Sequence, residues 1–235
     1  MKYLINYADK MFYQSRATNS ISGIRAGFDG VIQYKREDIS REFHADNSFI
    51  LSQPRGAGYW LWKPYFILET LKNVNDGDIV FYSDSGAEFI RHIQPIFDKL
   101  ENVSEGIVGF QLAGNHKEKE YTRKSVIKAV TGDIDTFAGS DQRMASFVVA
   151  RKCDESVEIV QKWLDLCQNS DLILDKPRED DEFLEFKDHR HDQSLWSLLT
   201  KKMNITILPD PTQWGIHHKQ TSDDDLFINH HRNKA

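Results

Sequence analysis

Apolar and polar residues along the chain form blocks that predict short β-strands separated by α-helices. Four segments are expected to be helices: Pro64–Asn73, Gln94–Glu101, Asp154–Gln168 and His191–Lys201. Six runs rich in β-branched and aromatic residues are expected to be strands: Tyr3–Tyr7, Gly30–Tyr34, Asp78–Ser83, Gly106–Gln111, Ala145–Ala150 and Asn204–Leu208. This alternation favours an α/β fold with a mostly parallel central sheet flanked by helices.

Two polar segments are expected to be loops. Leu112–Phe137 is strongly charged, and Asp175–Lys187 combines Pro177 with an acidic run. Long polar insertions in a compact domain are either lids over a ligand site or plain solvated connections. The histidine-rich and arginine-rich end, Asn229–Lys234, either folds back over a ligand or frays.

Length and charge limit the classes of protein to which this chain can belong. The 235 residues, 40% of them hydrophobic, fit one large α/β domain or two small ones. The formal net charge of -6 disfavours a nucleic-acid partner, which needs a basic face. The two cysteines, Cys153 and Cys167, suggest neither a disulfide framework nor a zinc site, so a reducing compartment is expected.

No run of residues approaches the roughly 20 apolar positions that a membrane-spanning helix needs. The apolar stretch before Asp9 is too short for a signal peptide and is better explained as a first strand. We therefore expect a cytoplasmic protein without a transmembrane segment, which reaches any membrane-linked substrate from the surface or through a partner.

The stretch Gly77–Gly86 is the most informative motif. A buried strand is followed directly by Asp84, Ser85 and Gly86. In open α/β sheets, ligands bind beyond the carboxyl ends of the strands, so Asp84 is expected to face a ligand. Its alternative role is to cap a turn.

The stretch Arg55–Pro64 is a second candidate. Two glycines precede a dense group of aromatic residues that includes Trp60, and Lys63 follows at an expected helix start. Glycines permit close backbone approach, helix N-termini favour phosphate, and aromatic rings stack on bases or sugars. The alternative is a turn beside core tryptophans.

The stretch His189–Ser194 is a third candidate, because it opens a leucine-bearing helix. Asp192 either caps that helix or acts as a base or hydroxyl holder at a reacting centre. His191 and Gln193 beside it, and Gln142 before a later strand, are candidate groups for a sugar or an acceptor. The late histidines His217, His218, His230 and His231 are either metal or ligand contacts or surface residues.

Together these three motifs resemble a family of small GT-A-type glycosyltransferase-like proteins, to which a chlorovirus capsid glycosyltransferase is related. The resemblance spans most of the chain. It implies a single GT-A, Rossmann-like nucleotide-diphospho-sugar transferase domain over residues 1–235. It also implies a nucleotide-sugar donor, UDP- or GDP-linked, and a glycan acceptor.

The resemblance also implies roles for particular residues. Donor binding is implied for Tyr7, Ala8, Asp9, Arg55, Trp60, Lys63, Ser83 and Gly86. Asp84 takes the place of the first acid of the family's metal motif, and Asp192 lies at the sugar or the acceptor. The late histidines lie near the diphosphate, and His230 is the candidate second metal ligand beside Asp84.

Gly86 departs from this family's pattern, because it stands where a second metal-binding acid is expected. Mg²⁺ and Mn²⁺ sites usually have more than one protein oxygen ligand. A divalent cation, Mn²⁺ or Mg²⁺, is therefore a hypothesis for this chain. A non-catalytic glycan-binding or protein-binding module on the same fold is the alternative function. A phosphohydrolase is disfavoured, because a second strand-end acid pair and a Walker-type loop are both missing from the sequence.

Overall fold

The structure is a computed structural model that describes residues 1–231. Its central sheet has six strands in the order β2-β1-β3-β6-β5-β7. The strands are β1 (Lys2–Tyr7), β2 (Gly30–Tyr34), β3 (Ile79–Ser83), β5 (Ile107–Gln111), β6 (Arg143–Arg151) and β7 (Ile207–Leu208). Each of the six predicted strands is therefore confirmed, to within a few residues at its ends.

The sheet is mostly parallel, as predicted. β1 pairs in parallel with β2 and β3, and β5 pairs in parallel with β7. The exception is β6, which runs antiparallel to both β3 and β5. A second, two-stranded sheet joins β4 (Glu88–Phe89) to β8 (Ile228–Asn229), so β8 returns to the segment that follows β3.

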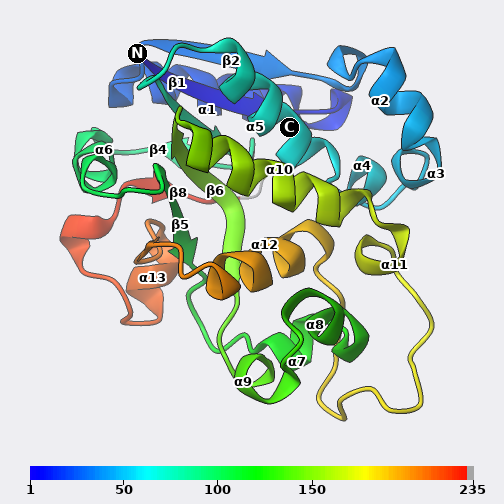
Figure 1. The fold of residues 1–235 in the computed structure, drawn as a ribbon. Coiled ribbons are helices and arrows are strands. Elements are labelled where there is room, and N and C mark those ends of the chain that lie inside the picture. Colours follow the sequence, from blue (N-terminus) through cyan, green and yellow to red (C-terminus); the bar gives the residue numbers. More distant parts are fainter. Residues whose placement is uncertain (232–235) are drawn as a thin grey trace.

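Helices cover both faces of the sheet (Figure 1). One face packs against α5 (Trp62–Asn73), α10 (Asp154–Gln168) and α12 (His191–Lys202). The other face packs against α1 (Tyr13–Ala26) and α6 (Gln94–Glu101). Neighbouring strand residues divide between the two cores as the pleat requires: Ile5 and Val80 belong to the first, Leu4 and Phe81 to the second. The four predicted helices are confirmed.

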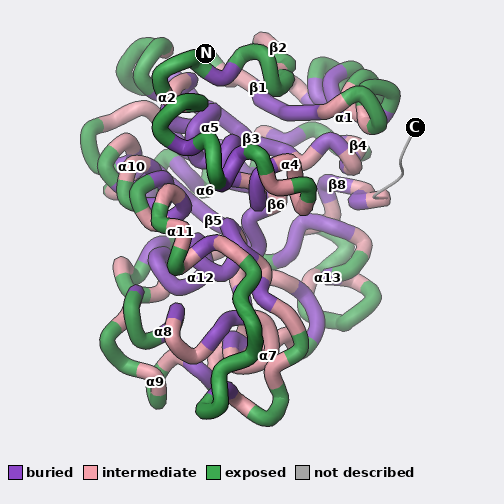
Figure 2. Tube along the Cα trace, turned by 90° about the vertical axis from the view of Figure 1, so that its right-hand side faces the viewer, coloured by how far each residue is buried: buried purple, intermediate pink, exposed green. Residues whose placement is uncertain are grey.

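One predicted loop is wrong. The segment Leu112–Phe137 contains α7 (Glu118–Tyr121), α8 (Lys124–Thr131) and α9 (Ile134–Ala138). A buried stripe of apolar residues, Val126, Ile127 and Val130, packs against α12. Neighbouring charged residues obscured this apolar pattern in the sequence. These helices lie together below α12, away from β1 and β2 (Figures 1 and 2). The other predicted loop, Asp175–Lys187, has neither helix nor strand.

Helix α1 was not predicted, because the side it buries is polar. Its buried residues include Ser15, Asn19 and Ser20, so no apolar stripe marks it. Asn19 accepts from Asn6 at 2.8 Å and donates to Ser83 at 3.0 Å, which ties α1 to β1 and β3. Hydrogen bonds therefore replace apolar contacts along this helix.

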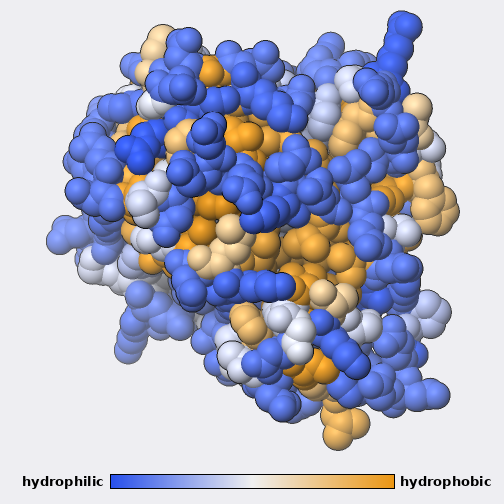
Figure 3. Space-filling view, viewed as in Figure 1, coloured by the Kyte–Doolittle hydropathy of each residue, from blue (hydrophilic) through white to orange (hydrophobic). Residues whose placement is uncertain are grey.

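The remaining helical elements are short. They are α2 (Arg41–Asp46), α3 (Ser48–Leu51), α4 (Gly56–Tyr59), α11 (Ser170–Ile173), α13 (Gln213–His217) and the 3₁₀ turns Lys10–Phe12, Arg36–Asp38 and Asp223–Asp225. Hydrophilic side chains cover most of the face in Figure 3, and hydrophobic residues show in the hollows between them. Within residues 1–231, no helix combines the length and the apolar character that a membrane crossing needs.

The aromatic packing around β3 gives a direct test of the core. Phe81 is fully buried, and its ring contacts those of Phe28, Phe89, Phe110 and Phe147. Phe81→Ala leaves a cavity at this junction, so we expect the free energy of unfolding to fall by about 3–5 kcal/mol in urea denaturation.

The matched control is Phe49→Ala, because Phe49 is 64% exposed. We expect a change within about 0.5 kcal/mol for this surface variant. Equal effects of the two substitutions would contradict the packing described for β3.

Candidate active site

Two adjoining pockets open beyond the carboxyl ends of β1 and β3. The first, here the polar pocket, has a volume of about 580 Å³ and includes Lys63, His116, Asp192, Asp210 and His218. The second, here the aromatic pocket, has a volume of about 540 Å³ and includes Tyr7, Phe12, Trp62, Tyr82 and Gly86. Four residues line both: Trp60, Asp84, Ser146 and His230. The pockets therefore meet at the end of β3.

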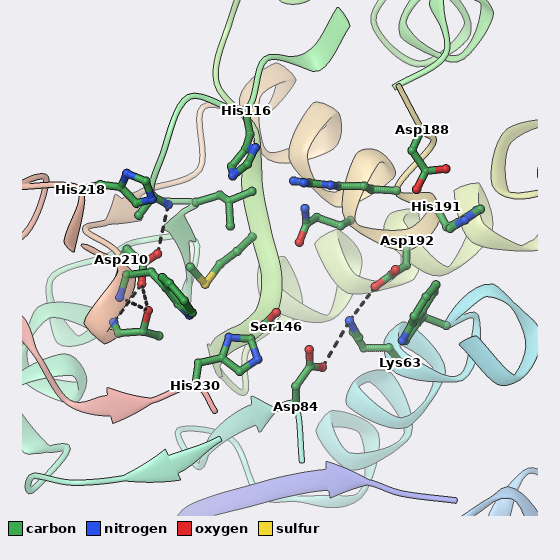
Figure 4. Close-up of a pocket in the computed structure, with 18 of the residues that line it drawn as sticks. Lys63, Asp84, His116, Ser146, Asp188, His191, Asp192, Asp210, His218 and His230 are labelled. Atoms are coloured by element: carbon green, nitrogen blue, oxygen red, sulfur yellow. Dashed lines mark hydrogen bonds and ion pairs between the residues drawn. The ribbon is translucent and has the colours of Figure 1, made fainter. Parts of the chain in front are cut away.

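A buried lysine holds two carboxylates at this meeting point. The Nζ atom of Lys63 lies 2.8 Å from Asp192 Oδ2 and 3.5 Å from Asp84 Oδ1. The Lys63 side chain is only 4% exposed. Tyr82 also donates a hydrogen bond from its hydroxyl to Asp84 Oδ1 at 2.6 Å. Figure 4 shows the three side chains in a row, with Lys63 between Asp192 and Asp84.

Three elements bring these charges together. Asp84 directly follows β3, Lys63 lies in the first turn of α5, and Asp192 lies in the first turn of α12. The Asp192 carbonyl accepts a hydrogen bond from Trp163 Nε1 at 3.0 Å, which fixes the start of α12 against α10. The Lys63–Asp84–Asp192 cluster is therefore set by the packing of two helices on the sheet.

Burial and charge determine the protonation of this cluster. Burial raises the pKa of Asp192 to about 6, although the Lys63 ammonium opposes that shift. Burial alone would lower the pKa of Lys63, but the charges of Asp192 and Asp84 outweigh it and raise that pKa. At neutral pH Lys63 thus stays an ammonium, and Asp192 is near its protonation point.

The segment before α5 has an unusual backbone. Gly56, Ala57, Gly58, Tyr59 and Trp60 all have φ between 52° and 104°. Three of these residues are not glycine, so the left-handed conformation carries strain. A hydrogen bond of 3.0 Å from Trp62 Nε1 to the Gly56 carbonyl closes the turn. In this strained segment, residues 56–60, Gly56 and Ala57 line the aromatic pocket and Trp60 lines both pockets.

Ion pairs tie this segment to the polar loop that precedes α12. Arg55 contacts Asp188 through both guanidinium nitrogens, at 2.5 and 3.1 Å, and Asp175 at 3.1 Å. Tyr59 donates its hydroxyl to Asp175 at 3.1 Å. The predicted role of Arg55 in donor binding stays a prediction, since its guanidinium lines the polar pocket while pairing with these acids.

The structure places most of the predicted site residues at the pockets. Those on the aromatic pocket are Tyr7, Ala8, Asp9 and Gly86. Those on the polar pocket are Arg55, Lys63, His191, Asp192 and Gln193, while Trp60, Asp84 and His230 line both. Of the other late histidines, His218 lines the polar pocket, whereas His217 and His231 line neither pocket.

Two predicted residues lie below the pockets. Ser83 and Gln142 are fully buried and line neither pocket, so their predicted roles at a ligand stay predictions. Their polar groups serve internal hydrogen bonds. Ser83 joins Asn19, and Gln142 accepts from Gln193 at 3.1 Å and from Arg190 at 3.2 Å.

The residues of the polar pocket that sequence reasoning missed include His116, Ser146, Asp210 and Trp214. A usable signal existed for two of them. His116 follows the end of β5 by five positions, and Asp210 follows the end of β7 by two. The rule that ligands bind beyond the carboxyl ends of strands, which selected Asp84, also points to these positions.

The meeting point offers a limited set of metal ligands. Asp84 and His230 line both pockets, whereas Gly86, on the aromatic pocket, has no side chain to serve as a ligand. Across residues 1–231, no group of three or more His, Cys, Asp or Glu side chains is arranged to hold a metal ion. The residues fit a divalent cation only if a ligand such as a diphosphate supplies the remaining oxygens.

Comparison with known proteins gives structural relatives only. No protein-family model matches the chain, and no curated protein matches its sequence. Mouse xyloside xylosyltransferase 1 superposes with a TM-score of 0.54 at 10% identity, covering 99% of this chain and 98% of that one. The galactosyltransferase LgtC, solved with donor and acceptor sugar analogues, gives a TM-score of 0.51 at 13% identity, covering 99% and 87%.

A third structure is the glycosyltransferase involved in glycosylation of the major capsid protein of PBCV-1. Its TM-score is 0.50 at 10% identity, with 99% of this chain and 95% of that one covered. The chain has the GT-A glycosyltransferase fold. This finding confirms the predicted fold class and agrees with the resemblance to GT-A-type glycosyltransferase-like proteins. At such low identity the GT-A likeness establishes the fold, and the activity has to be argued from the site.

The Lys63–Asp84–Asp192 cluster predicts a pH-dependent loss of stability in Lys63→Met. Without the ammonium, Asp192 either ionises as an unpaired buried charge or stays protonated while the unfolded chain ionises. At a pH above the usual pKa of a carboxylate, either state of Asp192 lowers the free energy of unfolding. We expect a loss of about 3–5 kcal/mol in urea denaturation at about pH 8, and a smaller loss at about pH 5, where Asp192 is mostly protonated.

Two controls separate this effect from lost packing. Lys72→Met lies on the same helix and breaks only an exposed pair with Glu69, so a change below about 0.5 kcal/mol is expected. The double variant Lys63→Met, Asp192→Asn should recover most of the stability at about pH 8, because it removes the buried charge. A loss in Lys63→Met that does not vary with pH would contradict the charge argument.

Proposed function

We propose that this protein is a glycosyltransferase that moves a sugar from a nucleotide-diphosphate donor to a hydroxyl of a glycan acceptor. One observation carries the proposal: the Lys63–Asp84–Asp192 cluster stands where two pockets meet at the end of a central strand. A group-transfer enzyme needs two substrate sites that share one reacting point. The GT-A fold supports the same reading.

The aromatic pocket suits the nucleotide of the donor. Tyr7 and Trp62 stack with ring centres 3.8 Å apart, and Trp60 adds a third ring at the boundary with the polar pocket. Flat aromatic faces suit a base or a ribose, and Gly86, which lines this pocket, has no side chain to keep a ligand at a distance. The donor diphosphate then lies at the meeting point, beside Lys63 and Asp84, and a UDP- or GDP-linked hexose is the expected donor.

The reaction breaks the bond between the anomeric carbon and the diphosphate oxygen and forms a bond to the acceptor oxygen. Negative charge develops on the diphosphate, where the Lys63 ammonium stabilises it. The acceptor hydroxyl loses a proton. If the configuration inverts, Asp192 takes this proton as a general base. If it is retained, the Asp192 carboxylate stabilises the positively charged sugar in the transition state.

A divalent cation belongs to this proposal as a cofactor held by Asp84 and His230 together with the donor diphosphate. When bound, it would neutralise charge on the leaving group. In this proposal Asp84 would contact both the cation and Lys63. The Lys63 ammonium therefore supplies part of the positive charge at the diphosphate that a more tightly held metal ion would otherwise supply.

The second candidate function is a non-catalytic module that binds a glycan or a protein partner. Two observations favour it: Gly86 replaces an acid, and Lys63 already neutralises Asp84. Donor turnover separates the two candidates.

The test of the proposal is turnover of UDP-, GDP- and CDP-sugars, combined with thermal unfolding in the presence of each nucleotide. We expect one nucleotide family to raise the unfolding midpoint, because it binds the folded state alone. Asp192→Asn should abolish transfer and leave that midpoint shift nearly intact. Absence of turnover with every donor, together with a retained nucleotide shift, would favour the non-catalytic module.

The cation makes a separate prediction. We expect excess EDTA to lower transfer activity and added Mn²⁺ or Mg²⁺ to restore it. In Asp84→Ala, added metal should no longer change the transfer activity. Thermal unfolding with the nucleotide, with and without Mn²⁺, provides a measurement that does not need turnover. Full activity in excess EDTA would exclude the cation.

A further inference from the structure

Basic side chains gather around Tyr121 at the far end of the polar pocket. The Arg190 guanidinium lies 3.7 Å from the centre of the Tyr121 ring, and the Lys187 ammonium lies 5.4 Å from it. The His116 ring meets the same tyrosine edge-on, with ring centres 5.2 Å apart. One aromatic ring therefore positions three basic side chains from two segments of the chain.

Two imidazoles also converge at this end of the pocket. Gly114 has a φ of 94°, and a Cβ atom at this position would lie 3.2 Å from His116 Nε2 and 3.4 Å from His218 Nε2. Both ring nitrogens thus approach the same point above a glycine that leaves room for them. The other ring nitrogen of His116, Nδ1, is buried without a hydrogen-bond partner in the described part of the chain.

Two acids face this cluster, and each has protein partners. Glu120 pairs with Lys187 at 2.6 Å. Asp210 accepts hydrogen bonds from the backbone of Ala113 at 3.1 Å and from the backbone and hydroxyl of Thr212 at 2.9 and 2.7 Å. Burial and then the charge of Arg190 lower the pKa of His116, although Glu120 opposes them. The groups of this cluster that suit an anion are therefore the Arg190 guanidinium and the imidazole N–H groups, which line the pocket.

This basic end lies on the opposite side of the polar pocket from the Lys63–Asp84–Asp192 cluster. Figure 4 shows His218 and Asp210 on one side, Lys63 and Asp192 on the other, His116 above the middle of the pocket, and Ser146 and His230 between the two sides. An acceptor with its reacting hydroxyl near Asp192 would extend toward His116 and His218. Trp214, which is 42% exposed and lines the same pocket, offers a face on which a sugar ring can stack.

We propose that His116, His218 and Arg190 form an oxyanion subsite, and that the acceptor sugar carries a carboxylate or a phosphate that binds there. This inference rests on the proposed function, because it assigns the polar pocket to the acceptor. Uronate and sugar phosphate share the chemistry that this subsite would recognise: oxygens that accept hydrogen bonds and carry negative charge.

The test is an NMR titration of the histidine ring signals with D-glucuronate, glucose 6-phosphate and D-glucose, each with and without UDP. We expect one or both anions to bind at least about tenfold more tightly than glucose and to raise the pKa of His116. A preference for glucuronate assigns a carboxylate, and a preference for glucose 6-phosphate assigns a phosphate. Equal binding of glucose, or no binding of either anion, would overturn the subsite.

Matched variants locate the binding. His116→Ala combined with His218→Ala should weaken binding of the preferred anion at least about tenfold. His217→Ala is the control, because His217 is adjacent to His218 but does not line the pocket, and it should bind as the wild type does. An unchanged affinity in the double variant would overturn the proposal.

The titration also separates this inference from the proposed function. If UDP competes with the anion, the oxyanion site is that of the donor diphosphate, and the acceptor assignment is wrong. The histidine signals need no turnover, so a failure of donor turnover leaves this result readable by itself. A failure of the histidine signals to respond likewise says nothing against donor turnover.

Discussion

The burial of the Lys63 ammonium is the constraint on which the site depends. A side chain that is 4% exposed keeps its charge only beside counter-charges, because burying an unpaired ion costs several kcal/mol. Asp84 and Asp192 provide them from the end of β3 and the start of α12. The relative positions of α5, β3 and α12 are therefore coupled through one ammonium group, and the same coupling fixes the place where the two pockets meet.

A buried polar network holds α12 in this position from the opposite side. Glu118 is fully buried, and it accepts from Lys201 at 2.6 Å, Ser197 at 2.5 Å and Thr122 at 2.6 Å. Lys201 and Ser197 belong to α12, which also carries Asp192. Each member of such a network has to be satisfied, since a buried polar group without a partner is costly. Helices α7 to α9 thus support the site without lining the aromatic pocket.

The parts of the fold that the sequence predicted are those with apolar periodicity. β3 is a run of buried apolar and aromatic residues, and its end gave the position of Asp84. Helix α1 buries Asn19 through hydrogen bonds, so its pattern carries no apolar signal. Helix α8 has a clear stripe from Val126 to Val130, but the surrounding charges obscured it. The left-handed run at residues 56–60 has no local sequence signature, because Tyr59 and Trp60 rarely adopt that backbone.

The sequence by itself determined the α/β class, the six strands and the three motifs, because strand propensity, turn residues and strand-end polarity are local properties. Tertiary structure alone decided that Lys63 bridges Asp84 and Asp192, that Ser83 and Gln142 lie below the pockets, and that His116 and His218 converge over Gly114. These contacts join residues far apart in the chain. They depend on how helices pack across the sheet, and no local pattern records that packing.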